Sequence, residues 1–165
     1  MKIDLSRHAP PGMELKEEKT VFTVGMSLSM IFSAFYFGSR YSNALSELYW
    51  RNGTIRTLKD GAIMIDFVEI LGEGLLGFLI VSALMIAAAV MHYVYHFYES
   101  KSIYTMRRLP SRWELHRRCL TLPAVGLVIS AITAMIFLVA FYAIYMNMTP
   151  DVCLTPGQWQ KIWSV

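Results

Sequence analysis

Cysteine and charge are both scarce in this 165-residue chain. Its two cysteines, Cys119 and Cys153, form no CxxC motif and are too few for a disulfide framework. Charged residues make up 16% of the sequence, whereas an ordinary soluble domain has about 25%. The net charge is +3 and the chain has no separate basic domain, so we expect no binding of nucleic acid.

Motifs that carry chemistry are missing as well. The chain has no GxxxxGK[ST] motif, whose glycines and lysine cradle nucleotide phosphates in P-loop proteins. Its polar residues do not converge on a catalytic pattern. We therefore predict that the chain is not an enzyme, that it has no catalytic residues and no metal site, and that it needs no cofactor.

Apolar residues, in contrast, make up 55% of the chain. They gather in three blocks, and a membrane helix needs roughly 20 mostly apolar residues. The first block follows a polar arm with four acids and no small-residue cleavage site, so we expect a retained span rather than a signal peptide. The sequence predicts an all-α integral membrane protein with three transmembrane helices plus short interfacial and cytoplasmic helices. The predicted spans are residues 20–38, 70–97 and 122–146.

The most basic segment, residues 99–119, lies between the second and third blocks and carries six basic against two acidic residues, a net charge of +4. Lys and Arg near span ends stay on the cytoplasmic side. We therefore expect a multi-pass protein of the cell membrane with a cytoplasmic N-terminus and an external C-terminus, and no pairing of Cys119 with Cys153. The predicted parts are a cytoplasmic arm (1–19), a three-span membrane domain (20–148) with an external loop (39–69) and the basic cytoplasmic loop (99–119), and an external interfacial tail (149–165).

Small and aromatic residues predict local structure around the first span. Gly25, Ser29 and Ser33 recur every four residues, which predicts a face where helices pack closely. Ala44–Trp50 suits a short interfacial helix, because Tyr and Trp favour the headgroup region. The Arg51–Gly53 sequence that follows is a turn signal.

Two capping boxes predict helix starts later in the chain. Ser111–Glu114 predicts a short helix from Arg112, separate from a third span that carries Pro123 in its first turn. Thr155–Gln158 predicts a short helix in the tail. An apolar face of that helix would lie on the membrane, formed by Trp159, Ile162 and Trp163.

Three acids open the second block. Asp66, Glu69 and Glu73 are spaced i, i+3 and i+7, which predicts one face of a helix. Carboxylates inside a membrane are costly and by default mark function. Glu73 and Glu69 are therefore a candidate intramembrane polar site, and the alternative is that these acids anchor the helix end at the interface.

Two histidines close the same block. His92 and His96 are four residues apart, a spacing that suits haem or metal ligation. Tyrosines surround them, so the alternative is an interfacial belt of aromatic and histidine side chains.

The basic loop carries a distinctive order of residues. Glu99 and Lys101 precede the run Met106–Arg112, which reads MRRLPSR, and Trp113–Leu115 follow. This order resembles the acidic residue, basic residue, LxxLPxSR-like core and short helix of ABC-2 type transporter permeases. The arrangement of arm, spans and loops over about residues 15–148 resembles the N-terminal half of that family, whose members have six spans where this chain shows three.

The resemblance implies a membrane-spanning subunit of an ATP-driven transporter. In that family the loop is a coupling helix that docks into a cytoplasmic ATP-binding subunit, so hydrolysis would occur in the partner chain, and further membrane subunits would complete a homo- or hetero-oligomer. Arginines offer several fixed donors and a tryptophan offers a buried anchor. The expected partner-binding residues are Arg107, Arg108, Arg112, Trp113, Glu114, Arg117 and Arg118.

Two other hypotheses remain open. The chain would be a regulator or assembly factor if its basic loop only contacts anionic lipid, which attracts each Lys or Arg by about 1 kcal/mol. It would be a redox subunit if His92 and His96 hold haem or a metal.

Overall fold

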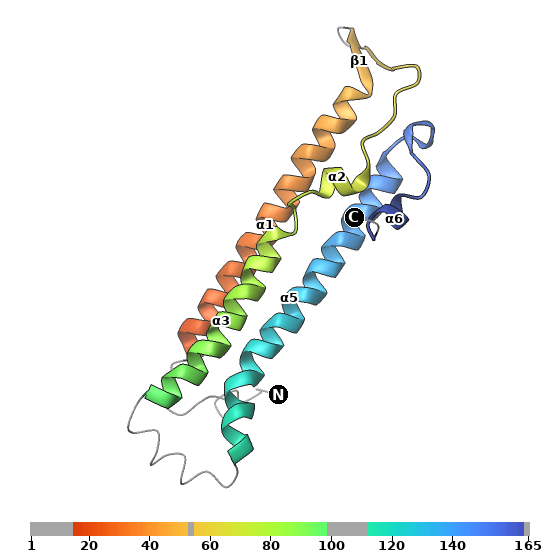
Figure 1. Ribbon diagram of the computed structural model, residues 1–165. Helices are drawn as coiled ribbons and strands as arrows, with labels where there is room; N and C mark the ends of the chain where they lie inside the picture. The colour runs from red at the N-terminus through yellow and green to blue at the C-terminus, as the bar shows by residue number, and fades with distance from the viewer. Residues whose placement is uncertain (1–14, 53–54, 99–111, 164–165) are drawn as a thin grey trace, which may run out of the picture. The chain divides into compact units, whose positions relative to one another are not determined.

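The computed structural model describes residues 15–52, 55–98 and 112–163, with the side chains of 15–16, 51–52, 55–56, 93, 95–98 and 112–119 excepted. Most of these residues are helical, as predicted (Figure 1). Three long helices dominate: α1 (Leu15–Glu47), α3 (Leu76–Tyr98) and α5 (Arg112–Met148). The chain divides into two compact units, one from residues 1–28 and 78–133 and the other from residues 29–77 and 134–165.

Two helical stretches are long and apolar enough to cross a membrane, where the sequence predicts three. They are Glu17–Glu47 and Leu120–Met148, and the third apolar stretch, Leu76–His92, is shorter. The second helix begins at Leu76 rather than near residue 70 because Gly72, with φ 39°, ends the short helix α2 (Phe67–Leu71). Glycine adopts a positive φ at little cost, so a turn separates α2 from α3.

The segment after the first apolar block differs from the predicted interfacial helix at Ala44–Trp50. Helix α1 continues to Glu47, and strands β1 (Tyr49–Asn52) and β2 (Ile55–Leu58) then pair antiparallel, with Tyr49 opposite Leu58. Aromatic and β-branched residues favour strands, and an Asn-Gly pair favours a two-residue hairpin. The predicted helix at Ala44–Trp50 is therefore wrong beyond Glu47, and the predicted turn ends at residue 53, which lies outside the described residues.

The small-residue face of α1 is confirmed as a packing face. Ser29 and Ser33 are buried in the second unit. A Cβ atom on Gly77 would lie 3.1 Å from the Cα of Ser29, so only glycine allows this approach of α3 to α1. In the first unit, Gly25 lies against Val81 in the same way, with 3.2 Å from a Cβ atom at Gly25 to a Val81 methyl.

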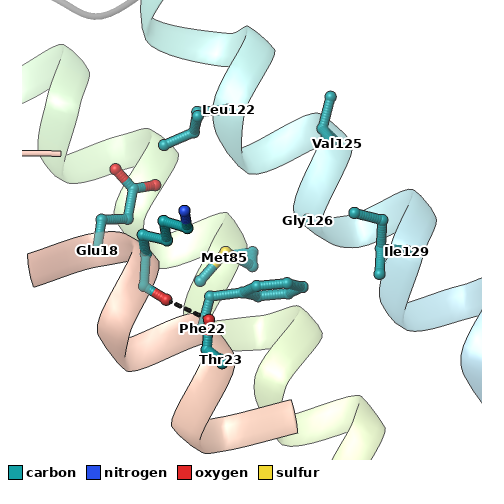
Figure 2. A pocket seen from close by; sticks show the side chains of 9 residues that line it. Glu18, Phe22, Thr23, Met85, Leu122, Val125, Gly126 and Ile129 are labelled. Carbon is teal, nitrogen blue, oxygen red and sulfur yellow. Dashed lines mark hydrogen bonds between the residues drawn. The ribbon is translucent and has the colours of Figure 1, made fainter. Parts of the chain in front are cut away.

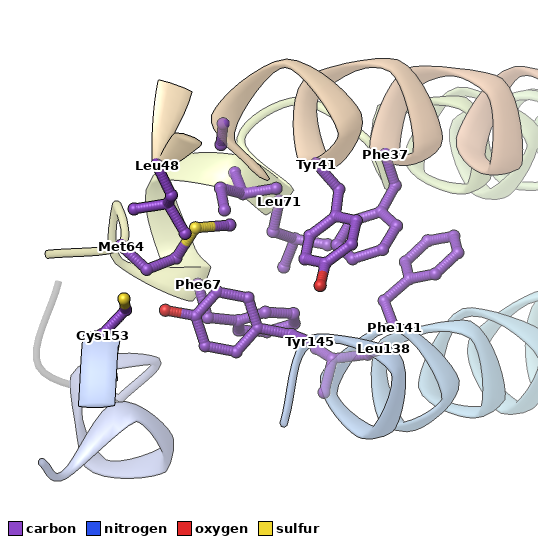
Figure 3. Packing of buried hydrophobic residues seen from close by; sticks show 12 residues of the cluster. Phe37, Tyr41, Leu48, Met64, Phe67, Leu71, Leu138, Phe141, Tyr145 and Cys153 are labelled. Atoms are coloured by element: carbon purple, nitrogen blue, oxygen red, sulfur yellow. The ribbon is translucent and has the colours of Figure 1, made fainter. Parts of the chain in front are cut away.

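The core of the second unit is aromatic (Figure 3). The rings of Phe37 and Phe141 stack at 4.2 Å, and Phe67 packs edge-on against Tyr145 at 5.6 Å. The Tyr145 hydroxyl donates to the carbonyl of Ile65 at 3.0 Å, so the polar tip of this fully buried ring is satisfied. Segments far apart in the sequence thus share one core.

The described part of helix α5 runs from Arg112, and it is not a separate short helix. It runs unbroken through Pro123 to Met148. Pro123 therefore does not stand in the first turn of the helix, although it is the fourth residue of the apolar stretch Leu120–Met148. A proline inside a helix costs about 3 kcal/mol, and here good helix formers on both sides, including Leu115 and Leu122, continue the helix across it. Ser111, the predicted cap, lies outside the described residues.

The tail folds back as a 3-10 turn, η2 (Asp151–Cys153), and a short helix, α6 (Gln158–Lys161). The short helix is as predicted, but the capping box does not form, because Gly157 occupies the N-cap with φ 75°. Thr155 instead donates its hydroxyl to Asp66 at 2.9 Å. Cys153 is a buried free thiol.

Candidate functional site

A pocket of about 280 Å³ lies within the first unit, between residues 18–23 of α1, residue 85 of α3 and residues 122–129 of α5 (Figure 2). Its apolar lining includes Phe22 from α1, Met85 from α3, and Leu122, Val125 and Ile129 from α5. The α5 residues recur at i, i+3 and i+7, which is the spacing of one helix face. The pocket is therefore built by helical periodicity from three separate segments.

Glycine keeps this pocket open. Gly126 lies on the same face of α5, and a Cβ atom there would approach the sulfur of Met85 to 2.9 Å and the ring of Phe22 to 3.4 Å. A larger residue at Gly126 would fill the space between α5 and its two neighbours.

Two charged residues, Glu18 and Lys19, also line the pocket. His92 is buried, and its Nε2 atom lies 3.2 Å from Oε2 of Glu18, whose side chain is 14% exposed. The other oxygen, Oε1 of Glu18, is buried and has no hydrogen-bond partner among the described residues. An ionised carboxylate only accepts hydrogen bonds, and a buried acceptor without a donor costs about 1–3 kcal/mol. One carboxylate oxygen of the site, Oε1 of Glu18, therefore lacks a hydrogen-bond donor among the described residues.

Sequence reasoning missed this pair. Glu18 was assigned to the polar arm, and His92 was considered only with His96, whose side chain is not described. The two residues are far apart in the sequence, so no local spacing joins them. Among the described residues, no group of three or more His, Cys, Asp or Glu side chains is arranged to hold a metal ion.

The acidic stripe predicted before the second span is not one helix face. Asp66 precedes α2, Glu69 lies within it, and Glu73 falls in the turn that separates α2 from α3. Glu69 and Glu73 are both exposed. Their role as an intramembrane polar site stays a prediction, while the helical stripe is wrong because Gly72 ends the helix between them.

Asp66 instead ties the tail to α2. Lys161 places its ammonium 2.7 Å and 2.8 Å from the two carboxylate oxygens, and the Gln158 amide donates to Oδ1 at 2.9 Å. The carbonyl oxygen of Gln158 accepts from the backbone N–H of Phe67 at 2.9 Å. The hydrogen bond from Lys161, followed by that from Gln158, lowers the pKa of Asp66 below its usual value of 3.8.

We expect the tail contact to weaken in acid. A carboxyl whose pKa is lowered by folding contributes its full stabilisation above its usual pKa of 3.8 and loses it as the pH falls through the lower folded value. Because Asp66 is 41% exposed, the pair contributes at most about 1 kcal/mol. Melting temperature measured from pH 7 to pH 3 should show Asp66→Asn less stable than wild type at pH 7, with the gap closing below pH 3.8. Glu69→Gln, an exposed carboxyl of the same segment, is the control, and a gap independent of pH would contradict the ion pair.

The predicted partner-binding residues fall at the edge of the described chain. Arg107 and Arg108 lie outside it. The backbone of α5 is helical from Arg112, so Trp113, Glu114, Arg117 and Arg118 belong to its first two turns, although the structure does not describe these side chains. Their role stays a prediction.

Comparisons with protein-family models, with curated proteins and with solved structures return no match for this chain.

Proposed function

We propose that this chain is a multi-pass membrane subunit whose three long helices lie in the bilayer. The observation that supports this most is the exposure of large apolar side chains along all three helices. Examples are Ile31 and Phe35 on α1, Leu79 and Met91 on α3, and Ile136 on α5. Water penalises exposed apolar surface by about 25 cal/mol per Å², and soluble monomers keep such patches small. Lipid removes that penalty.

Helix lengths support the same proposal. At about 1.5 Å of rise per residue, the 23 residues of α3 extend for roughly 34 Å, and a bilayer core is about 30 Å thick. The whole of α3 is therefore long enough for a third span, even though its most apolar stretch, Leu76–His92, is short. With the basic loop in the cytoplasm, the N-terminus is cytoplasmic and the hairpin and tail are external.

The second part of the proposal is that the basic loop and the first turns of α5 bind a cytoplasmic ATP-binding subunit. The resemblance of this loop to that of ABC-2 type permeases suggests the partner. The unbroken course of α5 from Arg112 to Met148 supports the role, because a continuous helix carries a displacement at its basic end directly into the apolar part. ATP hydrolysis would take place in the partner, and this chain would move with it.

Co-purification tests the partner directly. The chain is expressed with the P-loop ATPase encoded nearest to it, and the amount of ATPase retained is compared between wild type and Trp113→Ala/Arg117→Glu. We expect at least a tenfold loss. The matched control is Trp50→Ala/Arg56→Glu, which makes the same two changes on the hairpin assigned to the external side.

The control should retain the ATPase at the wild-type level. Equal retention by the loop variant would overturn the coupling role. If the loop variant instead lost binding to anionic vesicles while the ATPase never bound, the chain would be the lipid-contacting regulator or assembly factor.

A further inference from the structure

The pocket in the first unit has the composition of a site for an amphiphile. Its walls are apolar, yet a glutamate and a lysine adjacent in the sequence also line it. The volume of about 280 Å³ is close to the lower end of ligand pockets, which hold about 300–1,000 Å³. A pocket of this size takes a short apolar segment rather than a whole lipid.

The unsatisfied carboxylate oxygen of Glu18 favours a ligand whose polar head group is a hydrogen-bond donor. Glu18 lines the pocket, and its Oε1 atom has no hydrogen-bond donor among the described residues, so a ligand that carries a donor can satisfy this oxygen once the carboxylate turns toward it. His92 already lies against the other oxygen. A primary ammonium group offers three N–H donors together with the opposite charge, the stronger kind of hydrogen bond.

Lys19 adds a second requirement. Its positive charge beside the pocket opposes a ligand that is only cationic, and attracts one that also carries an anionic group. Apolar chain, ammonium and a neighbouring anion occur together in phospholipids with an ethanolamine head. We propose that this pocket binds such an aminophospholipid, with its ammonium on Glu18, its phosphate near Lys19 and part of an acyl chain against Phe22 and Met85. The inference rests on the proposed membrane location, since the ligand enters from the bilayer.

The test uses short-chain lipids that dissolve as monomers. Purified full-length protein in detergent is titrated with dihexanoyl phosphatidylethanolamine and with dihexanoyl phosphatidylcholine, and binding is followed by native mass spectrometry. The choline head has the same charges and similar shape but no N–H donor. We expect phosphatidylethanolamine to bind at least tenfold more tightly. Free phosphoethanolamine, which lacks the chains, should not bind at matching concentrations.

Two variants of neighbouring residues sharpen the result. Glu18→Gln should reduce the tenfold preference to near unity. Both lipids lose the attraction to the negative charge, but only phosphatidylethanolamine also loses a charge-assisted hydrogen bond. Glu17→Gln makes the same change one residue earlier, on an exposed side chain, and should keep the preference. Gly126→Leu, which fills the pocket, should weaken both lipids.

Equal affinity of wild type for the two lipids, or an unchanged preference in Glu18→Gln, would overturn the inference. The inference would also be overturned if Glu17→Gln lost the preference for phosphatidylethanolamine to the same extent as Glu18→Gln. Extraction of cell membranes with alkaline carbonate is measured first, so that the two proposals fail separately. Protein released by carbonate contradicts the membrane location, whereas retained protein without a lipid preference contradicts only the pocket assignment.

Discussion

Phe67→Ala should strongly lower the stability of the second unit. Phe67 is 0% exposed, and its ring contacts Phe37, Tyr142 and Tyr145 at centroid distances of 5.4–6.3 Å. Removing a buried aromatic ring costs about 3–5 kcal/mol, because the contacts vanish and a cavity remains. At roughly 2–4 °C per kcal/mol for a chain of this size, a loss of 3 kcal/mol lowers the melting temperature by about 6–12 °C.

The same substitution at Phe35 provides the control. Phe35 lies on the same helix as Phe37 but is 77% exposed, so Phe35→Ala should shift the melting temperature by little. Both variants are measured in one detergent by intrinsic fluorescence. If Phe67→Ala melted within a degree or two of Phe35→Ala, the aromatic cluster would not be the core of this unit.

Ile136→Asp should prevent stable insertion into membranes. Ile136 is 60% exposed and lies near the middle of the apolar stretch Leu120–Met148. An aspartate at the centre of a membrane helix costs about 3 kcal/mol, and every 1.4 kcal/mol is a factor of ten in equilibrium. We therefore expect the insertion equilibrium of α5 to fall roughly a hundredfold, measured as the carbonate-resistant fraction of the full-length chain.

Val152→Asp is the control that distinguishes a lipid environment of these helices from an aqueous one. Val152 is 88% exposed and lies in η2, beyond the end of α5. In water, an aspartate would be tolerated at either exposed position. In a bilayer, Val152→Asp should insert as wild type does while Ile136→Asp does not. Normal behaviour of both variants would reject the membrane proposal.

Local sequence signals predicted the helices and several of their ends. The spacing of Gly25, Ser29 and Ser33 identified the packing face of α1, because a four-residue period fixes one side of a helix whatever packs against it. The helical backbone after Arg112 and the short tail helix were also predicted from local residue types. Such features depend on residues within one or two turns, which the sequence contains directly.

Errors arose where two local signals competed. Asp66, Glu69 and Glu73 have helical spacing, but Gly72 lies among them and its positive φ ends the helix. Pro123 suggested a helix start, yet helix α5 already includes the residues from Arg112 to Leu122 before it. Tyr49 and Trp50 suggested an interfacial helix, while pairing with β2 favoured a strand. The spacing alone does not rank these signals, because their energies differ by about 1–3 kcal/mol and depend on packing.

The sequence by itself determined the mostly helical class and the apolar blocks. It also determined the concentration of basic residues between the second and third blocks. These features depend only on the composition and the hydrophobic period of each segment, which the sequence contains directly. Only the tertiary structure decided which distant residues meet. Glu18 reaches His92, and Asp66 reaches Lys161, across separations that no periodicity links. Each pair forms because packed helices or a returning tail place its members within 3.2 Å or less, and the free energy of that packing is shared among many residues.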